Sequence, residues 1–169
     1  PRRGPAEPDS RHSERVQEKM NTAEKTMPGV SFTTSRFGAI TVAEDRIINF
    51  VQGVPGFEKL KRFILIDHDA DGVFRWLQAV DDPAVAFLLT DPNQFRPEYA
   101  VPLRKADADW LGVKDAASLI TLVMVCVSQE TKELSLNLKG PVVFNADNMK
   151  AIQCVLDRDD SPSNFPIKI

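Results

Sequence analysis

Residues 36–57 read RFGAITVAEDRIINFVQGVPGF, and this stretch decides the fold. It joins short runs of β-forming residues through two turns that contain glycine. Val54-Pro55-Gly56 places a residue with fixed φ directly before one that tolerates positive φ, which is the requirement of a type II turn, and Phe57 follows as an apolar anchor. Such a corner orients two strands but carries no reactive side chain. This is the first indication that the protein acts by presenting a surface.

The rest of the chain continues the same alternation of short apolar runs and turn signals. Strands are predicted at 32–35, 39–42, 47–51, 62–67, 74–80, 84–90, 119–127, 134–138, 141–144 and 152–156. Residues 103–112 carry the spacing of a short helix that ends at Gly112, and 115–118 predict a further helical turn. We therefore expect an all-β, mainly antiparallel protein: a closed or nearly closed β-barrel-like domain with one short helical insert.

Composition divides the chain into two parts. The first 29 residues hold six basic and five acidic side chains with almost no large apolar group, so residues 1–30 are predicted to be a disordered extension. Residues 31–169 are predicted to form a single β-barrel-like domain. Of the 21 basic and 24 acidic residues in the chain, 15 and 19 remain beyond residue 29, a net charge of −4. This charge favours a basic protein over nucleic acid as a partner, although it is also an ordinary charge for solubility.

Several other classes of function find no support in the sequence. No apolar run reaches the ~20 residues of a membrane span, and no signal sequence is recognisable at the start, so a cytoplasmic protein is expected. Cys126 and Cys154 lie in apolar runs and predict two buried, reduced thiols. The run Asp67 to Gly72 copies the opening of a calcium loop, but its twelfth position is Gln78 and its flanks predict strands. We expect no metal, no cofactor and no direct nucleic-acid binding.

Catalysis is not indicated either. His68 lies beside three aspartates, yet no serine or cysteine nucleophile and no glycine-rich turn is tied to it by a motif, so a solvated loop histidine is predicted. The chain is predicted not to be an enzyme.

Short motifs in a fixed order give a more specific indication. They are Arg36-Phe37-Gly38, Phe50-x-x-Gly53-Val54-Pro55-Gly56-Phe57, Phe74-x-Trp76-Leu77-Gln78, Asp82-Pro83-x-x-Ala86-Phe87, Asp91-Pro92 with Tyr99, Leu111-Gly112, and Asn137-Leu138-Lys139-Gly140-Pro141-Val142-Val143-Phe144-Asn145 with Gln153 after it. In this order and spacing the chain resembles the FliW family of bacterial flagellar assembly factors over about residues 33–167.

The resemblance implies a non-enzymatic, β-barrel-like cytoplasmic protein that switches between two protein partners. Such proteins bind newly made flagellin and, when flagellin is scarce, bind and inhibit CsrA, a small basic RNA-binding dimer that represses flagellin translation. The acidic balance of residues 30–169 agrees with the capture of a basic protein. We expect a monomer when no partner is bound.

Residues for the partner surface are chosen from the acidic turns and the loop bracketed by Pro92 and Pro97. The carboxylates of an acidic rim would meet the basic partner, and the rings of Phe95 and Tyr99 would anchor it. In the alternative, both rings fold back over the mouth of the barrel. Asn137 either joins this surface or holds strand to strand by a hydrogen bond to the backbone. The predicted partner-binding residues are Asp81, Asp82, Asp91, Phe95, Glu98, Tyr99 and Asn137.

A small-molecule-binding barrel is the competing function. A closed β architecture can hold an apolar ligand in its mouth, and Phe74, Trp76 and Phe87 would line such a cavity unless they fill it.

Overall fold

The computed structural model describes residues 29–168. Most of the predicted extension, residues 1–28, lies outside this range, and residues 29 and 30 open the first strand instead of closing the extension. The strands are β1 (Gly29–Thr34), β2 (Gly38–Ala43), β3 (Ile48–Phe50), β4 (Arg62–Asp67), β5 (Phe74–Ala79), β6 (Ala86–Thr90), β7 (Leu119–Val127), β8 (Leu134–Leu136), β9 (Val142–Asn145), β10 (Lys150–Gln153) and β11 (Phe165–Ile167). The helical segments are η1 (Glu44–Arg46), η2 (Pro92–Gln94), α2 (Lys105–Leu111) and η3 (Ala116–Ser118).

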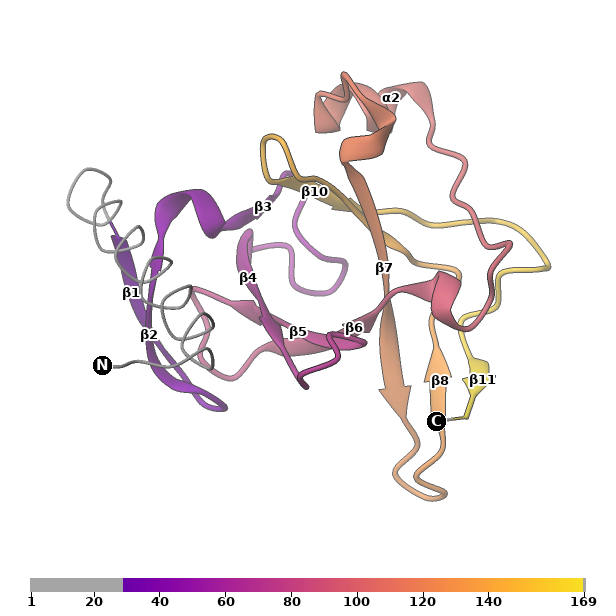
Figure 1. Cartoon of the computed structure of the whole chain (residues 1–169), viewed down its shortest axis with the longest axis horizontal. Helices are drawn as coiled ribbons and strands as arrows, with labels where there is room; N and C mark the ends of the chain where they lie inside the picture. Colours follow the sequence, from indigo (N-terminus) through magenta and orange to yellow (C-terminus); the bar gives the residue numbers. More distant parts are fainter. Residues whose placement is uncertain (1–28, 169) are drawn as a thin grey trace, which may run out of the picture.

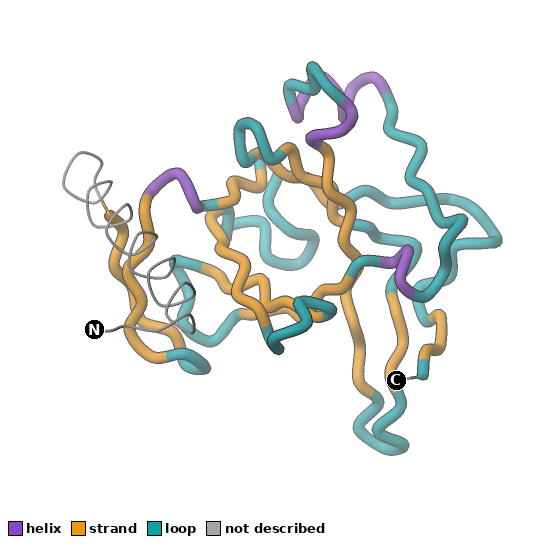
Figure 2. The backbone as a smooth tube through the Cα atoms, viewed as in Figure 1, coloured by secondary structure: helices purple, strands orange, loops and turns teal. Residues whose placement is uncertain are grey.

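Seven strands close a barrel in the order β7-β6-β5-β4-β3-β10-β9, with β9 pairing back to β7 (Figures 1 and 2). All neighbours in this barrel are antiparallel except β3 and β10. The long strand β7 continues past the barrel, where its second half pairs with β8, and β11 adds to β8. Over residues 29–168, the structure confirms the predicted mainly antiparallel β-barrel with one short α-helix and shows that the barrel is closed.

The Val-Pro-Gly-Phe corner forms as predicted. Gly56 has φ +87° and the amide of Phe57 donates to the carbonyl of Val54 at 2.7 Å, which closes the turn. Phe57 remains 41% exposed, with its ring edge-on to Phe87 at a centroid distance of 5.4 Å. Val54 is buried in the cluster that fills the barrel interior, whereas the ring of Phe57 covers part of the barrel wall from outside.

Three apolar clusters account for the packing. The barrel interior is filled by one of them, which includes Phe50, Phe63, Leu77 and Leu89. A second lies outside β7, β9 and β10, beneath the loop of residues 95–103 and the C-terminal segment, and includes Leu136 and Leu138. The third lies between the outer face of β4 and the β1–β2 hairpin.

The third cluster explains why β4 is apolar on both faces. Phe63 points into the barrel and Ile64 points out to the hairpin, and both are buried. The hairpin is also held by Arg36, whose guanidinium lies 4.0 Å from the centre of the Trp76 ring.

Helix α2 ends as its sequence predicts. Gly112 adopts a left-handed conformation with φ +62°, and the last carbonyl, that of Leu111, accepts bonds from the side chains of Asn145 and Asn148 at 2.9 Å each. The helix buries Leu111 and Asp107, whereas Trp110 is 50% exposed.

Two local predictions were wrong. The strand predicted at 152–156 is β10 and ends at Gln153, although the amides of Cys154 and Leu156 still bond to the loop after β8. Cys126 is exposed rather than buried, because the end of β7 leaves the barrel and that side chain lies on the uncovered face, while Cys154 is buried as predicted. Burial raises the pKa of the Cys154 thiol to about 11.

Within the described residues, no helix has the length and apolarity needed to cross a membrane.

Candidate functional site

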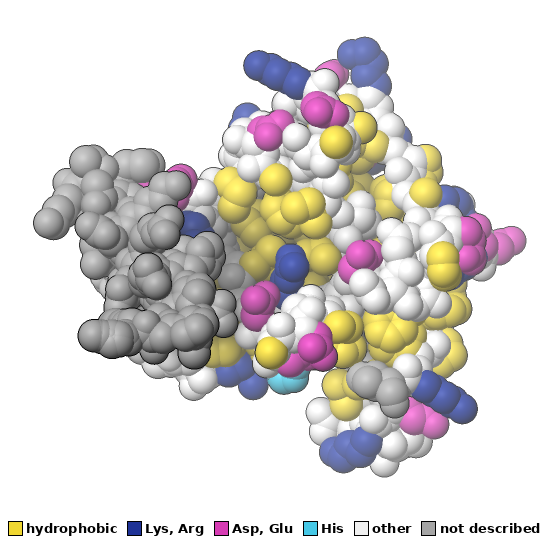
Figure 3. All heavy atoms as spheres, viewed as in Figure 1, with side chains coloured by type: hydrophobic (Ala, Val, Ile, Leu, Met, Phe, Trp, Pro, Cys, Tyr) yellow, Lys and Arg dark blue, Asp and Glu magenta, His cyan; other side chains and the backbone are white. Residues whose placement is uncertain are grey.

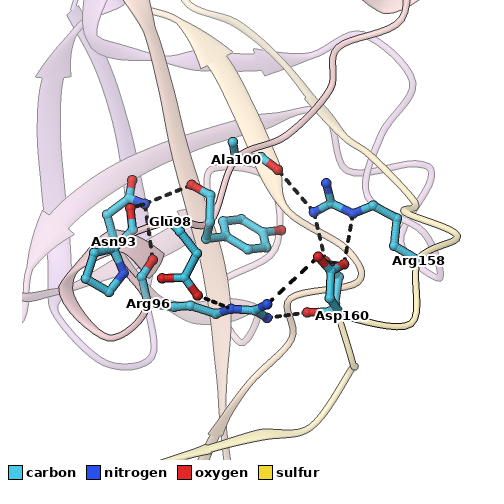
Figure 4. Close-up of polar contacts among 9 residues, drawn as sticks. Asn93, Arg96, Glu98, Ala100, Arg158 and Asp160 are labelled. Atoms are coloured by element: carbon cyan, nitrogen blue, oxygen red, sulfur yellow. Dashed lines mark hydrogen bonds and ion pairs between the residues drawn. The ribbon is translucent and has the colours of Figure 1, made fainter.

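The loop between β6 and α2 is held against the C-terminal segment by a small network of charged side chains. Figure 4 shows Arg96 and Arg158 pointing toward Asp160 from opposite sides. We call these three residues the clamp. It joins residues that are about 60 positions apart in the chain, so it fixes the orientation of the loop that carries four of the predicted partner-binding residues.

Arg96 contributes to the clamp through all parts of its guanidinium. Its Nε donates to Glu98 Oε1 at 2.9 Å, Nη1 donates to the backbone carbonyl of Asp160, and Nη2 lies 3.9 Å from a carboxylate oxygen of the same residue. The cation also lies 5.7 Å from the ring of Phe165 in β11. The Arg96 side chain is only 20% exposed, which makes the arrangement more restrained than an ordinary surface pair.

Arg158 holds the other end of the loop. Its Nη2 donates to the carbonyl of Ala100 at 3.0 Å and to the hydroxyl of Ser161 at 2.8 Å, and its Nε lies 3.3 Å from Asp160 Oδ1. Asn93 closes the loop on itself, because its side-chain amide donates to the carbonyl of Tyr99 at 2.8 Å and to that of Pro97 at 3.1 Å. The loop is therefore a built element with fixed side-chain directions.

The two predicted carboxylates of this loop are engaged within the chain. Asp91 caps η2 by accepting a bond from the amide of Asn93 at 2.9 Å. The pKa of Glu98 is lowered, first by a bond from its own amide and second by Arg96. Glu98 is exposed and Asp91 is partly exposed, so the loop presents two carboxylates in set positions.

Asp81 and Asp82 lie in the β5–β6 turn, which is positioned by a buried glutamine. Gln78 is fully buried, and its amide nitrogen donates to the carbonyls of Ala79 and Val85 at 3.0 and 3.1 Å. Asp82 accepts from the amide of Ala84 at 3.0 Å. Asp81 pairs with Arg62 at 2.6 Å, and this hydrogen bond lowers the pKa of the carboxyl.

The predicted acidic rim is not one surface. Asp81 and Asp82 precede β6 and Asp91 follows it, so the five residues of that strand separate the two groups by about 15 Å. Figure 3 agrees on the face it shows, where acidic side chains form small separate groups among basic and apolar ones. The prediction of a single rim was wrong because consecutive turns of an antiparallel sheet lie at opposite ends of the strand between them.

Two of the predicted contact residues, Tyr99 and Asn137, have structural roles, and Phe95 is partly covered. Tyr99 is 7% exposed, and its hydroxyl donates to the carbonyl of Leu138 at 2.6 Å in the second core. It cannot serve as an exposed anchor; the alternative, that this ring folds back, is what the structure shows. Phe95 is half-buried against Phe74, with 6.3 Å between the ring centres. Asn137 accepts from the amide of Gly140 at 3.0 Å and shapes the break between β8 and β9.

The residues predicted to line a ligand cavity are not brought together. Phe74 and Trp76 point away from the barrel interior, toward the second core and toward Arg36 respectively, because inward and outward positions alternate along β5. Only Phe87 packs against the interior cluster. His68 has a defined contact as well, since its Nδ1 accepts from Trp76 Nε1 at 3.1 Å. Among residues 29–168, no group of three or more His, Cys, Asp and Glu side chains is arranged to hold a metal ion.

The clamp was not predictable from the sequence. The sequence predicted a loop bracketed by Pro92 and Pro97 and a last strand ending at residue 156, and it assigned no role to Arg96, Arg158 or Asp160. Pairing between such distant residues leaves no periodic pattern, and the one available signal is a segment rich in charge, Asp157 to Asp160, shortly before the apolar Phe165.

Comparisons with known proteins agree on one family. A family model described as "FliW protein" matches residues 31–167. The chain is 36% identical over 139 residues to the flagellar assembly factor FliW of Caldanaerobacter subterraneus subsp. tengcongensis, covering 82% of this chain and 93% of that protein. It is 33% identical over 135 residues to the flagellar assembly factor FliW of Bdellovibrio bacteriovorus, covering 80% and 77%. A crystal structure of the flagellar assembly factor FliW superposes with a TM-score of 0.73 at 27% identity, covering 82% of this chain and 99% of that one.

Proposed function

This chain belongs to the FliW family of flagellar assembly factors, and from that premise we propose that it binds flagellin and, when flagellin is scarce, binds and antagonises the RNA-binding translational repressor CsrA. It acts in the cytoplasm as a stoichiometric binding protein, not as an enzyme. The free protein then reports the supply of unassembled flagellin through mass action, because flagellin and CsrA draw on the same pool.

The single observation that supports this proposal is the family match over 31–167, which covers nearly all described residues. The structure adds a physical reason for a basic partner. Its folded part carries a net charge of −4 beyond residue 29, and several carboxylates are held in fixed positions. Complementary fields of this kind raise association rates and select partners.

We place the basic partner's contact on the clamped loop, at Asp91 and Glu98 with Phe95 beside them. The loop is restrained before binding, so little conformational entropy is lost when a partner docks. Asp81 and Asp82 form a separate patch at the other end of β6, and they contribute only if the partner spans both ends of the strand.

The test compares two double charge reversals that change the net charge equally. Asp91→Lys with Glu98→Lys is expected to slow association with CsrA about tenfold at low salt and to flatten the dependence of the rate on salt. Glu130→Lys with Glu133→Lys, on the exposed β7–β8 hairpin, is the matched control and is expected to change the rate much less. Stopped-flow fluorescence measures both rates, and calorimetry with purified flagellin and CsrA establishes whether each complex forms.

If neither flagellin nor CsrA binds the wild-type chain, the proposed function is wrong. If both bind and the two double variants associate equally fast, the function stands and the contact lies elsewhere.

A further inference from the structure

The first half of β7 lacks a neighbouring strand on the side that faces β6. β6 pairs with β7 only at Leu89 with Met124 and at Thr90 with Val123. On its other side β7 is paired with β9 through residues 119–122. The first half of β7 therefore has a partner on one side, and on the side of β6 the ladder stops at Val123.

The register shows which backbone groups face this gap. The amide of Ala146 donates to the carbonyl of Ser118, so even-numbered residues of β7 direct their backbone groups toward β9, and Met124 in the same way accepts from Asn137. Backbone groups alternate along a strand. Leu119 and Thr121 therefore direct their N–H and C=O groups away from β9, toward the place that β6 would occupy if it continued.

Pro92 explains why β6 does not continue. Extending the pairing of Thr90 with Val123 by two residues places Pro92 opposite Thr121, and proline has no N–H to donate. Asp91 caps η2 at the same point, which turns the chain away from the ladder. The gap is thus encoded in the sequence after β6.

A groove of about 550 Å³ lies at this edge. Four consecutive residues of β7, 119–122, line it, and the β4–β5 turn and η2 form its walls. Its volume is within the range of binding pockets. The charged lining residues are Asp71, Asp91 and Arg75, and Arg75 is paired with Asp67 at 3.4 Å. The remaining charge in the groove is negative.

We propose that this groove receives an extended segment of a partner polypeptide, which adds a short strand to the free edge of β7 and places a lysine or arginine side chain near Asp71 and Asp91. The added strand would form backbone hydrogen bonds with Leu119 and Thr121, and its basic side chain would meet the acidic walls of the groove. The inference rests on the proposed function only in taking a polypeptide as the partner.

The first experiment needs neither natural partner. Its probe is a pool of acetylated hexapeptides with a fixed lysine and with Val, Thr or Ser at the other positions, added to ¹⁵N-labelled protein. The amide resonances of Leu119 and Thr121 are expected to shift downfield, and their hydrogen exchange is expected to slow. A second pool that is N-methylated at alternate residues, and so cannot complete a ladder, is expected to have no such effect.

A matched pair of variants tests the charge. Asp91→Asn keeps the cap of η2 and removes one negative charge, and it is expected to raise the dissociation constant of the hexapeptide pool about twofold to fivefold. Asp115 caps η3 in the same way, with its carboxylate 2.9 Å from the amide of Ala117, but it does not line the groove. Asp115→Asn is therefore expected to leave the constant unchanged.

The inference is overturned if the shifts are absent or fall outside the groove, if the N-methylated pool acts equally, or if the two variants bind alike. These results are independent of whether flagellin and CsrA form complexes with the chain. If those complexes form and leave the exchange of Leu119 and Thr121 unchanged while the hexapeptides slow it, the groove is a peptide site for a different polypeptide.

Discussion

Replacing Tyr99 by phenylalanine tests the assignment of this ring to the core. The change removes one hydroxyl and leaves the carbonyl of Leu138 without the bond that it accepts at 2.6 Å. A buried acceptor without a partner costs about 1–3 kcal/mol. Because Tyr99 retains 7% exposure, some water reaches the site, and we expect a loss of about 1–2 kcal/mol in the free energy of unfolding. For a domain of this size the loss corresponds to about 3–6 °C in Tm.

The same hydroxyl makes a prediction about pH. Burial is the main reason that the pKa of Tyr99 is raised to about 12 from the ordinary value of 10, and the positive charge of Arg158 opposes the shift. Between these two values the unfolded chain ionises and the folded chain does not. The contribution of the buried, protonated Tyr99 hydroxyl to the free energy of unfolding is therefore complete below pH 10 and is lost as the pH rises toward 12. The advantage of the wild type over Tyr99→Phe is expected to shrink by about 1 kcal/mol at pH 11, once solvent screening is allowed for.

Urea unfolding at pH 8 and pH 11 measures both effects. Tyr99 is the only tyrosine of the chain, so the absorbance of phenolate at 295 nm follows this residue alone in the native protein. Equal stability of wild type and variant at pH 8 would refute the buried hydrogen bond. A gap that is the same at both pH values, or a phenolate transition near pH 10 in the folded protein, would refute the burial argument.

Three further measurements test the clamp, the corner and the thiols. Arg96→Met is expected to lose about 1–2 kcal/mol and to speed hydrogen exchange in the C-terminal segment, whereas Lys105→Met, which breaks the exposed pair with Asp109, should change stability by less than about 0.5 kcal/mol. Gly53→Ala should lower the free energy of unfolding by about 2 kcal/mol or more in thermal unfolding, because φ is +71° and the new Cβ would lie 2.6 Å from the backbone oxygen of Glu58. The control Gly38→Ala, with φ +74° and open space around the new Cβ, should lower it by about 1 kcal/mol. Ellman's reagent should modify one cysteine rapidly and Cys154 only on unfolding, since burial keeps that thiol protonated.

The elements of this fold were predictable because their signals are local. Strand β7 was predicted with its observed bounds, since nine residues rich in Val, Leu and Ile leave little choice of structure. Gly56 and Gly112 marked a turn and a helix end through the positive φ that each adopts. The number of predicted strands indicated a closed or nearly closed barrel, and the pairing of β9 with β7 shows that the barrel is closed.

The grouping of the candidate residues was not predictable in the same way. Acidic turns that are close in sequence were assigned to one rim, but the strand between Asp82 and Asp91 places them apart. The ring of Tyr99 was ambiguous, because a loop between two prolines predicts an irregular backbone and does not show which side is covered. The covering segment is the chain around Arg158 and Ser161, and only the folded structure brings it there.

The unpaired edge of β7 and the loop that covers Tyr99 have a common physical cause at the junction of β6 and β7. A barrel needs every edge paired, yet Pro92 limits this junction to two residue pairs. The chain that would have continued β6 instead forms the loop that the clamp holds over the second core, with Tyr99 bonded beneath it. One proline thus both frees an edge of β7 and produces the restrained acidic loop beside it. We therefore expect partner binding at the loop and peptide binding at the edge to respond together when Asp91 or the chain after Thr90 is changed. They should respond separately when only Glu98 or only Asp71 loses its charge.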